Sequence, residues 1–310
     1  MIYFNHLLRC QKRNQFKALT LRLHSMFIPR RILEDKLKQF LVDDVGQGDV
    51  TAAAVIPSNL AVRAEIVAKE NGIVAGVEEA VVLAEYLGLT AKGKIADGEK
   101  VRNSQVILEI SGDAQGILCV ERTMLNLLSR MSGIATKTNM LREKLQEVNS
   151  RARIACTRKS APGLLYFDKK AVVLGGGDPH RLHLDDLILI KDNHLAIVGS
   201  IEEAIKKAKT NASFSKKIEV EVTSFGDALK AAEAGADIVM LDNFSAKQAK
   251  KVCKALRESG FCNLILEVSG GINGENFLEY AESQVDIISL GELTHNVKAL
   301  DLSLEILKKN

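Results

Sequence analysis

The stretch that decides the fold is IEVEVTSFGDALKAAEAGADIVMLDN, residues 218–243. It begins with a short apolar run over 218–222 and ends with a second one over 237–241, and residues 225–236 between them have a helical pattern. A strand, a helix and another strand in this order form the repeating unit of a parallel sheet. The stretch therefore predicts an α/β fold in which helices cover a parallel sheet.

The same alternation continues over the C-terminal half of the chain. Seven short β-rich runs recur there: RIACT (153–157), KAVVL (170–174), LILI (187–190), IEVEV (218–222), DIVML (237–241), LILEV (264–268) and DIISL (286–290). Units of this kind commonly close into a barrel, so we expect a parallel α/β barrel. A doubly wound open sheet is the alternative, but the first strand-to-helix turn lacks the glycine fingerprint of dinucleotide-binding folds.

The N-terminal half has fewer strands and longer helices. Its expected elements are helices over 28–40, 77–88 and 119–148 and strands over 61–76 and 101–110. We expect Gly133 to interrupt the last and longest of these helices, because glycine weakens a helix interior.

The net charge of +3 is unevenly distributed along the chain. Residues 1–25 carry five basic side chains and no acidic one, whereas the remaining residues carry 37 basic and 39 acidic side chains. The body of the protein thus lacks the basic excess typical of nucleic-acid binding. Residues 1–25 could be a basic arm, a transit-like presequence or an extension upstream of a start at Met26. Their low Ser and Thr content is unusual for a transit peptide, and we favour an extension outside the fold because the motif-bearing sequence begins only after Met26.

Two further features concern the compartment. No apolar run approaches the roughly 18 residues of a membrane-spanning helix. The five cysteines are scattered and form no CxxC pair that would indicate a zinc site, a pattern that fits a reducing cytoplasm. We expect a cytoplasmic protein with no membrane or nucleic-acid partner.

Polar residues or glycines follow the predicted strands. In strand order they are Arg158 and Lys159, then His180 and Arg181 behind three glycines, Lys191, Glu221, Asp242, Ser269 with Gly270 and Gly271, and Gly291 with His295. The carboxyl ends of parallel strands meet on one rim of a barrel, where active sites are built. Their joint position therefore predicts an active site on this rim.

The charges on this rim indicate the kind of ligand. The cations belong to the first three strand ends and suit carboxylate or phosphate groups. Glu221 and Asp242 follow the fourth and fifth strands and offer the hard oxygen ligands that Mg²⁺ accepts. Simpler interpretations remain for single residues: Glu219 and Glu221 could form a solvated strand edge, and Asp242 could cap the next helix.

Several motifs together resemble a known family. They are DDVGQGDVT (43–51), ERTMLNLLSRMSGIAT (121–136), TRKSAPG (157–163), GGGDPHR (175–181), LILIKDNH (187–194), EVEV (219–222), LDNF (241–244), SGGI (269–272) and GELTH (291–295). In this order they resemble the quinolinate phosphoribosyltransferases, and the resemblance covers about residues 28–305. Ser160-Ala161 and Leu165 depart from the family pattern, and Leu165 replaces an arginine that many members carry.

The resemblance implies a fold and a reaction. A smaller N-terminal α/β sandwich domain, residues 26–130, would precede a seven-stranded, incomplete parallel α/β barrel, residues 131–292, and a C-terminal helical segment, residues 293–310. The reaction would join quinolinate to phosphoribosyl pyrophosphate and release nicotinate mononucleotide, pyrophosphate and CO₂. Mg²⁺ would take part, without an organic cofactor. The enzyme would be a homodimer with shared active sites, or a higher oligomer.

The resemblance also implies roles for single residues. Quinolinate would contact Arg122 from the neighbouring subunit and, within one subunit, Arg158, His180, Arg181 and Lys191. Phosphoribosyl pyrophosphate would contact Lys159, Glu221, Asp242, Ser269, Gly270, Gly271, Gly291 and His295. Glu221 and Asp242 would hold Mg²⁺, directly or through water. Lys159, Lys191, Glu221 and Asp242 would form the catalytic group.

Two other functions fit parts of the pattern. One is a related transferase that acts on another acceptor, such as nicotinate, or the molybdenum-transport-associated paralogue. Against it stands the concentration of cations, which a monocarboxylate would not need. The other is a binding protein without catalysis that retains the barrel.

Overall fold

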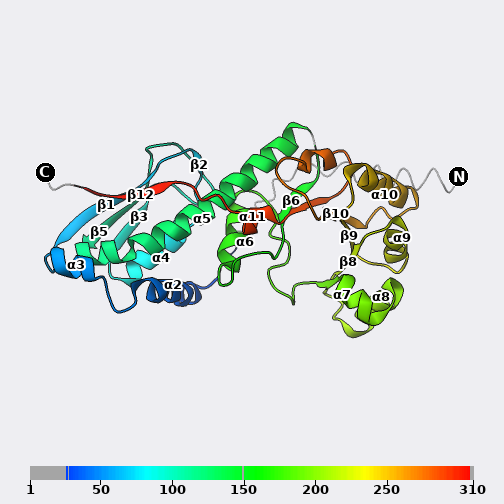
Figure 1. Ribbon diagram of the computed structural model, residues 1–310, viewed down its shortest axis with the longest axis horizontal. Coiled ribbons are helices and arrows are strands. Elements are labelled where there is room, and N and C mark those ends of the chain that lie inside the picture. Colours follow the sequence, from blue (N-terminus) through cyan, green and yellow to red (C-terminus); the bar gives the residue numbers. More distant parts are fainter. Residues whose placement is uncertain (1–25, 27, 149, 308–310) are drawn as a thin grey trace. The chain divides into compact units, whose positions relative to one another are not determined.

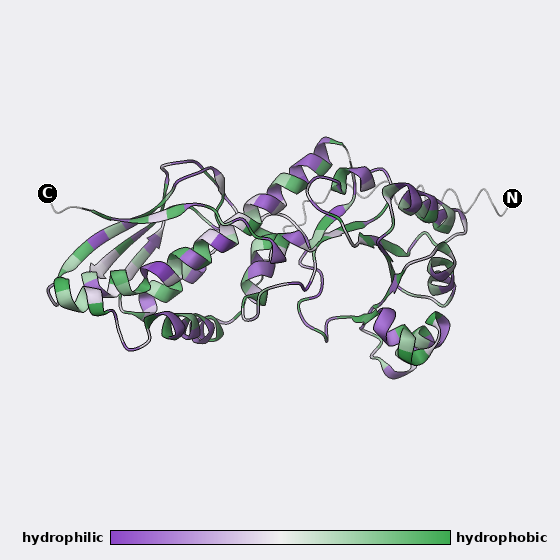
Figure 2. Ribbon diagram, viewed as in Figure 1, coloured by the Kyte–Doolittle hydropathy of each residue, from purple (hydrophilic) through white to green (hydrophobic). Residues whose placement is uncertain are grey.

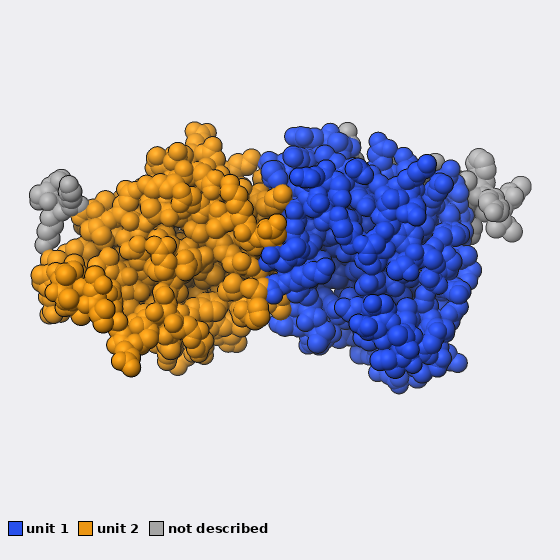
Figure 3. Space-filling model, in the orientation of Figure 1, with its two compact units in different colours: residues 1–23, 140–160, 177–295 blue, residues 24–139, 161–176, 296–310 orange. Residues whose placement is uncertain are grey.

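The computed structural model describes residues 26, 28–148 and 150–307, so the expected extension over residues 1–25 lies outside the described residues. The described chain forms two compact units (Figure 3). The N-terminal unit contains residues 26–139, 161–176 and 296–307. The barrel unit contains residues 140–160 and 177–295. Within the described residues, no helix is both long and apolar enough to cross a membrane.

The N-terminal unit is built on a four-stranded antiparallel sheet with the strand order β12-β1-β5-β3. Its strands are β1 (Ala61–Ala68), β3 (Thr90–Gly93), β5 (Val106–Asp113) and β12 (Leu302–Leu307), and a separate pair joins β2 (Gly72–Ile73) to β4 (Lys100–Val101). Its helices are α2 (Arg30–Val45), α3 (Val50–Val55), α4 (Val77–Tyr86), α6 (Leu165–Leu174) and the first part of α5 (Ala114–Glu147). Green and purple residues alternate along α5 in Figure 2, as expected of a helix with one apolar side.

Residues 293–307, the described part of the C-terminal segment 293–310, do not form the expected helical segment. Helix in this described part is confined to α11 (Glu292–His295), and β12 pairs with β1 along an edge of the antiparallel sheet. The sequence of β12, LSLEIL, alternates apolar and polar residues with the period of two that is typical of a strand with one covered face.

The run 170–174 was expected to be a strand and belongs instead to α6. Seven consecutive residues of α6, Phe167 to Val173, are buried on every side, so their sequence shows no amphipathic period. Asp168 within this run accepts hydrogen bonds from Arg130 Nε and Nη2 at 2.7 and 2.9 Å. A short apolar run of this kind is compatible with a buried strand or a buried helix, and periodicity cannot separate the two.

Gly133 does not interrupt α5, which is continuous from Ala114 to Glu147. A Cβ atom at Gly133 would lie 2.1 Å from the backbone oxygen of Lys298 and 3.0 Å from Ala299 Cα. Glycine is present because another backbone segment passes close to the helix.

The barrel unit is a parallel six-stranded sheet with the order β6-β11-β10-β9-β8-β7, and helices connect several of its strands (Figure 1). Its strands are β6 (Arg153–Cys156), β7 (Ile188–Ile190), β8 (Ile218–Val222), β9 (Ile238–Asp242), β10 (Ile265–Ser269) and β11 (Ile287–Leu290). Its other elements are α7 (Asp192–Val198), α8 (Ile201–Asn211), α9 (Phe225–Glu233), α10 (Ala246–Glu258), η2 (Phe277–Tyr280) and α11. Ser200, Ser224 and Ser245 cap α8, α9 and α10 through their side-chain oxygens.

This architecture confirms the predicted α/β fold with a small N-terminal domain and an incomplete parallel barrel, with six strands among the described residues in place of seven. A single bridge extends the sheet beside β6, where Asp178 pairs with Ala155 in the parallel direction. The Asp178 N–H donates to Ile154 O at 2.8 Å, and the Cys156 N–H donates to Asp178 O at 3.2 Å. The bridge brings the residues that follow Asp178 to the carboxyl end of β6.

Candidate active site

A pocket of about 620 Å³ lies at the carboxyl ends of the parallel strands. The predicted site residues in its wall are Arg158, Lys159, His180, Arg181, Lys191, Glu221, Asp242, Ser269, Gly270 and Gly271. The barrel thus brings ten predicted residues from widely separated motifs into one cavity.

The wall of the pocket follows the two-residue period of the strands. Lys191, Asp242 and Ser269 line it at the strand ends, and Leu189, Met240 and Glu267 line it two positions earlier. Residues two apart in a strand face the same side of the sheet. The rim residues and the deeper residues therefore come from the same inward-facing rows.

One part of the wall is strongly cationic. Among the described residues, no acidic side chain lies within 4.0 Å of the charged groups of Arg158, Lys159, Arg181 or Lys191. Burial and the neighbouring Arg158 charge lower the pKa of Arg181 below its ordinary value. Unpaired cations crowded together favour an anionic ligand, which removes their mutual repulsion.

The carboxylates of Glu221 and Asp242 lie on adjacent strands in the same wall. Burial raises the pKa of Glu221, and the negative charge of Asp242 raises it further. Asp242 does not cap α10, whose N-cap is Ser245. Two carboxylates with mutual repulsion and hard oxygen atoms fit a divalent cation such as Mg²⁺.

The turn after β10 requires glycine. Gly270 has φ of +86°, and a Cβ atom there would lie 2.6 Å from Asn243 Oδ1 and 2.7 Å from Asp242 Oδ1. Asn243 also has positive φ, +57°, and its N–H donates to Ser269 O at 2.9 Å. The turn can therefore approach Asp242 only because position 270 has no side chain, and the backbone is left open toward a ligand.

Gly291 and His295 are not in the pocket wall but lie beside it. A Cβ atom at Gly291 would lie 3.0 Å from the His295 ring and 3.5 Å from Lys159 Cδ. Thr294 Oγ1 donates to the backbone oxygen of Lys159 at 2.7 Å. These contacts attach α11 to the loop that carries Lys159.

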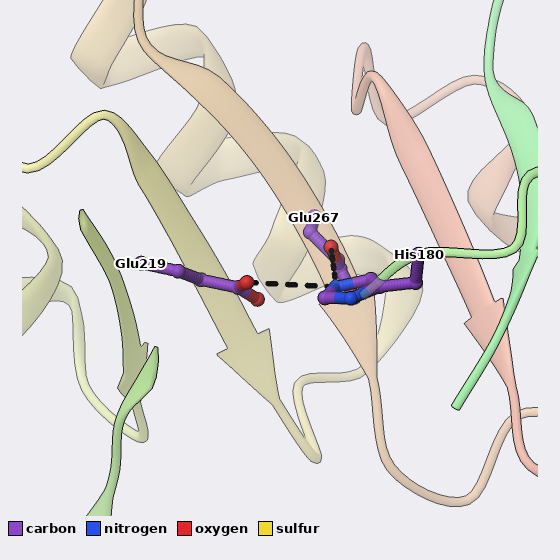
Figure 4. A group of neighbouring side chains, drawn as sticks. All are labelled: His180, Glu219 and Glu267. Atoms are coloured by element: carbon purple, nitrogen blue, oxygen red, sulfur yellow. Dashed lines mark hydrogen bonds and ion pairs between the residues drawn. The ribbon is translucent and has the colours of Figure 1, made fainter. Parts of the chain in front are cut away.

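His180 lies at the inner end of the pocket with both ring nitrogens engaged. Its Nε2 is 3.2 Å from Glu267 Oε2 and 3.5 Å from Glu219 Oε2, and Nδ1 accepts a hydrogen bond from the Arg181 N–H at 2.7 Å (Figure 4). Burial lowers the pKa of His180, but hydrogen bonds and charges of the two glutamates outweigh this effect and raise it to about 10. Glu219 is fully buried, so the alternative of a solvated edge is wrong for this residue.

Arg122 lies on α5 in the N-terminal unit. Its side chain is 65% exposed, and its Nη2 lies 4.0 Å from Glu121 Oε1. Its predicted role in the site of a neighbouring subunit stays a prediction. Leu165, the departure from the family pattern, begins α6 in the same unit and is not in the pocket wall.

Sequence reasoning gave no role to eight residues of this pocket. They are Cys156, Thr157, Leu189, Asp192, Met240, Asn243, Glu267 and Ser289. A signal for Glu267 was present, because it stands two positions before Ser269 in a strand whose rim residue was identified. Asp192 and Asn243 were expected on the rim, directly after Lys191 and Asp242, but carried no signal for a separate role.

Comparisons with known proteins agree with this architecture. Residues 49–132 match the family model for the N-terminal domain of quinolinate phosphoribosyl transferase, and residues 134–305 match the model for its C-terminal domain. A probable nicotinate-nucleotide pyrophosphorylase [carboxylating] from Methanocaldococcus jannaschii is 49% identical over 276 residues, which cover 88% of this chain and 96% of that protein. The nicotinate-nucleotide pyrophosphorylase [carboxylating] of Dictyostelium discoideum is 35% identical over 300 residues, 92% of this chain and 99% of that protein.

A solved structure matches over nearly its whole length. The nicotinate-nucleotide pyrophosphorylase from Francisella tularensis superimposes with a TM-score of 0.83 and 35% identity, and the match covers 91% of this chain and 98% of that chain. The likeness therefore includes both units of the fold.

Proposed function

Because the chain belongs to the quinolinate phosphoribosyltransferase family, we propose that the pocket of the barrel unit binds quinolinate beside phosphoribosyl pyrophosphate. The chain is a carboxylating nicotinate-nucleotide pyrophosphorylase of NAD biosynthesis. The reaction joins the two substrates and releases nicotinate mononucleotide, pyrophosphate and CO₂. The observation that carries the placement of the substrates is a set of four cations, without acidic partners among the described residues, that share one pocket with Glu221 and Asp242.

We assign the cationic wall to quinolinate. Arg158 and Arg181 offer planar guanidinium groups that bind carboxylates through two parallel hydrogen bonds. Lys191 adds a point charge, and the two carboxylates of quinolinate would offset the repulsion that lowers the pKa of Arg181. His180 stands behind Arg181 at the inner end of the same wall.

We assign the acidic part of the pocket and the glycine turn after β10 to the phosphoribosyl donor. Glu221 and Asp242 can accept hydrogen bonds from the ribose hydroxyls, and the open backbone at Ser269, Gly270 and Gly271 can receive the 5′-phosphate. Gly291 and His295 lie beyond Lys159 and extend this phosphate region. Lys159 stands between the two regions and can contact the pyrophosphate.

The same two acids would hold Mg²⁺ with the donor. Their oxygen chemistry and mutual repulsion fit such an ion, which supplies charge neutralisation of the leaving pyrophosphate when it is bound. The phosphate groups of the donor would complete the ion's coordination.

The pocket performs the transfer by orientation and electrostatics. The pyridine nitrogen is already a nucleophile, so the protein need not provide a general base. Arg158 and Arg181 hold the ring by its carboxylates, and the donor site holds the anomeric carbon, which together reduce the entropic cost of the encounter. After transfer, the positively charged ring nitrogen stabilises the electron pair that remains on the adjacent ring carbon as CO₂ departs, and that carbon then takes up a proton from water. Lys159 and Lys191 provide the positive potential for both steps.

We also propose that the active form is a homodimer in which Arg122 completes the site of the neighbouring subunit. Its side chain is exposed, and its contact with Glu121 among the described residues is long, at 4.0 Å, so it is available for such a contact. A second subunit would add another guanidinium to the region that binds quinolinate. A cytoplasmic location, expected from the cysteine pattern, stays a prediction.

The choice of acceptor separates this function from its nearest alternative. Purified protein with phosphoribosyl pyrophosphate and Mg²⁺ should form mononucleotide from quinolinate, and nicotinate should be used at least about a hundredfold less well, because one carboxylate leaves part of the cationic wall unpaired. Equal use of nicotinate would contradict the assignment of the cationic wall. Binding of both substrates without product would support a binding protein in place of an enzyme.

A further inference from the structure

Two carboxylates on the strands that form the pocket are fully buried. Glu219 of β8 and Glu267 of β10 each have no exposed surface. Glu267 Oε1 accepts a hydrogen bond from Ser289 Oγ at 2.6 Å, whereas neither oxygen of Glu219 has a hydrogen-bond partner among the described residues beyond its 3.5 Å contact with His180. Burying two ionised acids costs roughly several kcal/mol unless hydrogen bonds or opposite charges compensate them. Hydrophobic residues would serve stability better, so their presence calls for a role at the site.

The group that these acids contact is held in an unusual backbone conformation. His180 has φ of +52°, a left-handed conformation that side chains other than glycine rarely adopt. Three contacts fix it there: its N–H donates to Asp178 Oδ1 at 2.8 Å, Nδ1 accepts from the Arg181 N–H at 2.7 Å, and Nε2 faces Glu267 at 3.2 Å. Strained residues persist where the surrounding structure determines them, and such residues cluster at functional sites.

The strained conformation of His180 affects the position of the next residue in the chain. Arg181 follows His180 directly and lines the pocket next to Arg158, with a pKa lowered by burial and by that neighbour. Without a restraint, charge repulsion would move the Arg181 side chain away from Arg158. The hydrogen bond from its backbone N–H to the His180 ring ties its position to that ring, and the ring is tied in turn to the buried carboxylates.

We propose that Glu267, supported by Glu219, is a positioning residue for dicarboxylate binding, which anchors the His180 ring and thereby holds Arg181 in the pocket. The inference deepens the proposed function and rests on it. The acids act through the His180 ring, which both of them face. A substrate carboxylate can reach Arg181 without rearrangement, but it can reach a His180 ring nitrogen only if one of the internal contacts is given up.

The contact between Nε2–H and Glu267 is present in both charge states of the imidazole. The contact from the Arg181 N–H requires a lone pair on Nδ1, which only the neutral ring with its proton on Nε2 provides. Full protonation of the ring, which the two acids favour, puts a proton on Nδ1 and removes the contact from the Arg181 N–H. In that form Arg181 is held through its peptide bond to the anchored His180, and the anchor depends on Nε2–H in both forms.

A metal site is the competing use of the same side chains. Ligand atoms of His180, Glu219 and Glu267 lie within 4.8 Å of one another. The contacts already described occupy Glu267 Oε1 and His180 Nδ1, and the neighbouring Arg181 disfavours a further cation. A stoichiometric metal ion that remains in the purified enzyme and is lost in Glu267→Gln would overturn the positioning role.

The test compares Glu267→Gln with wild type and with Glu202→Gln, an exposed glutamate on α8 as matched control. In Glu267→Gln we expect KM for quinolinate to rise about tenfold, with KM for phosphoribosyl pyrophosphate within about twofold of wild type. The control should leave both constants unchanged. A folded Glu267→Gln enzyme in which both KM values rise equally, or neither does, would overturn the inference.

Two further measurements keep the result decisive. The ring Nε2–H signal of His180, observed by NMR with ¹⁵N-histidine, should shift or exchange faster in Glu267→Gln, which a general loss of stability would not cause selectively. If Glu267→Gln does not fold, Ser289→Ala removes one hydrogen bond from Glu267 and should raise KM for quinolinate in the same direction by a smaller factor; no change would count against the anchor. Direct titration of wild type with quinolinate distinguishes failure of this inference from failure of the proposed function. A wild-type protein that binds no quinolinate contradicts the proposed function itself.

Discussion

The residues at the strand ends divide the pocket into two regions of opposite charge. Arg158 and Arg181 lie in one region without acidic partners, and Glu221 and Asp242 lie in the other with a raised pKa on Glu221. In each region like charges repel until a ligand of opposite charge binds. Substitutions in the two regions should therefore affect different substrates.

Replacing Arg181 with Ala should raise KM for quinolinate by about a hundredfold, because a half-buried guanidinium that can bind a carboxylate through two hydrogen bonds is lost. Arg181→Lys should recover only part of this loss, since lysine keeps the charge without the planar pair of donors. Asp242→Ala should chiefly raise KM for phosphoribosyl pyrophosphate. Steady-state kinetics with each substrate varied in turn checks the separation, and equal effects of Arg181→Ala and Asp242→Ala on both substrates would contradict it.

A second prediction at this scale concerns pH and Cys253, a fully buried thiol on α10. Burial raises its pKa from 9.0 to about 12. The unfolded chain therefore loses this proton first, so the thiol's contribution to stability is complete below about pH 9 and declines as pH rises from there toward 12. Urea unfolding should show wild type losing about 1 kcal/mol more than Cys253→Ala between pH 7 and pH 10. Parallel pH dependence of the two proteins would show that the thiol ionises normally.

At the level of single residues the sequence predicted the charged residues and glycines at the strand ends, and missed Glu267 and Ser289 inside the strands. Lys191, Asp242 and Ser269 were identified because charge or glycine follows an apolar run. Glu267 was missed because an acid inside a strand is ordinarily assigned to a solvated face, and only burial distinguishes the two cases. Its burial depends on the closure of the barrel around it, which is a property of the whole sheet.

Among the elements, strands and helices with a clear period were predicted well. The strand at 218–222 and the helix expected within residues 225–236 are confirmed as β8 and α9. The errors fall where the surroundings override the pattern. Seven consecutive residues of α6 are buried on all sides, so their sequence has no amphipathic period. The alternation of apolar and polar residues in β12 was overlooked, and this segment was expected to be helical.

Gly133 in α5 gives a test at the same scale. Gly133→Ala should destabilise the protein by about 2–3 kcal/mol, because the added methyl group would overlap the backbone at Lys298. Gly116→Ala in the same helix is the matched control: its Cβ would lie 3.4 Å from Leu89 Cδ2, so we expect a change below about 1 kcal/mol. Chemical denaturation of both variants checks the difference. Equal stability would show that the chain near Lys298 moves aside.

For the whole molecule, the net charge of +3 does not indicate which ligand the protein binds. The cations that matter are a handful of side chains gathered in one pocket, and the body of the protein around them is slightly acidic. The division into units was also only partly visible in the sequence, because segments 161–176 and 296–307 fold with the N-terminal unit although they are distant from it in the chain. Such exchange depends on tertiary contacts that no local pattern encodes.

Assembly can be tested by subunit complementation. Arg122→Ala and Asp242→Ala should each have little activity alone. If Arg122 acts in the neighbouring site, a mixed dimer has one site with both defects and one site with none, so random mixing should restore about one quarter of wild-type activity. Activity should be assayed after unfolding and refolding the two variants together. A mixture no more active than its components would place Arg122 outside the shared site.

The most direct test of the central claim is release of CO₂ from quinolinate labelled in the carboxylate next to the ring nitrogen. Wild-type protein should release one labelled CO₂ for each nicotinate mononucleotide formed, and only when phosphoribosyl pyrophosphate and Mg²⁺ are both present. Arg181→Ala should reduce both products in the same ratio. Mononucleotide formed without labelled CO₂, or CO₂ released without the phosphoribosyl donor, would contradict the account.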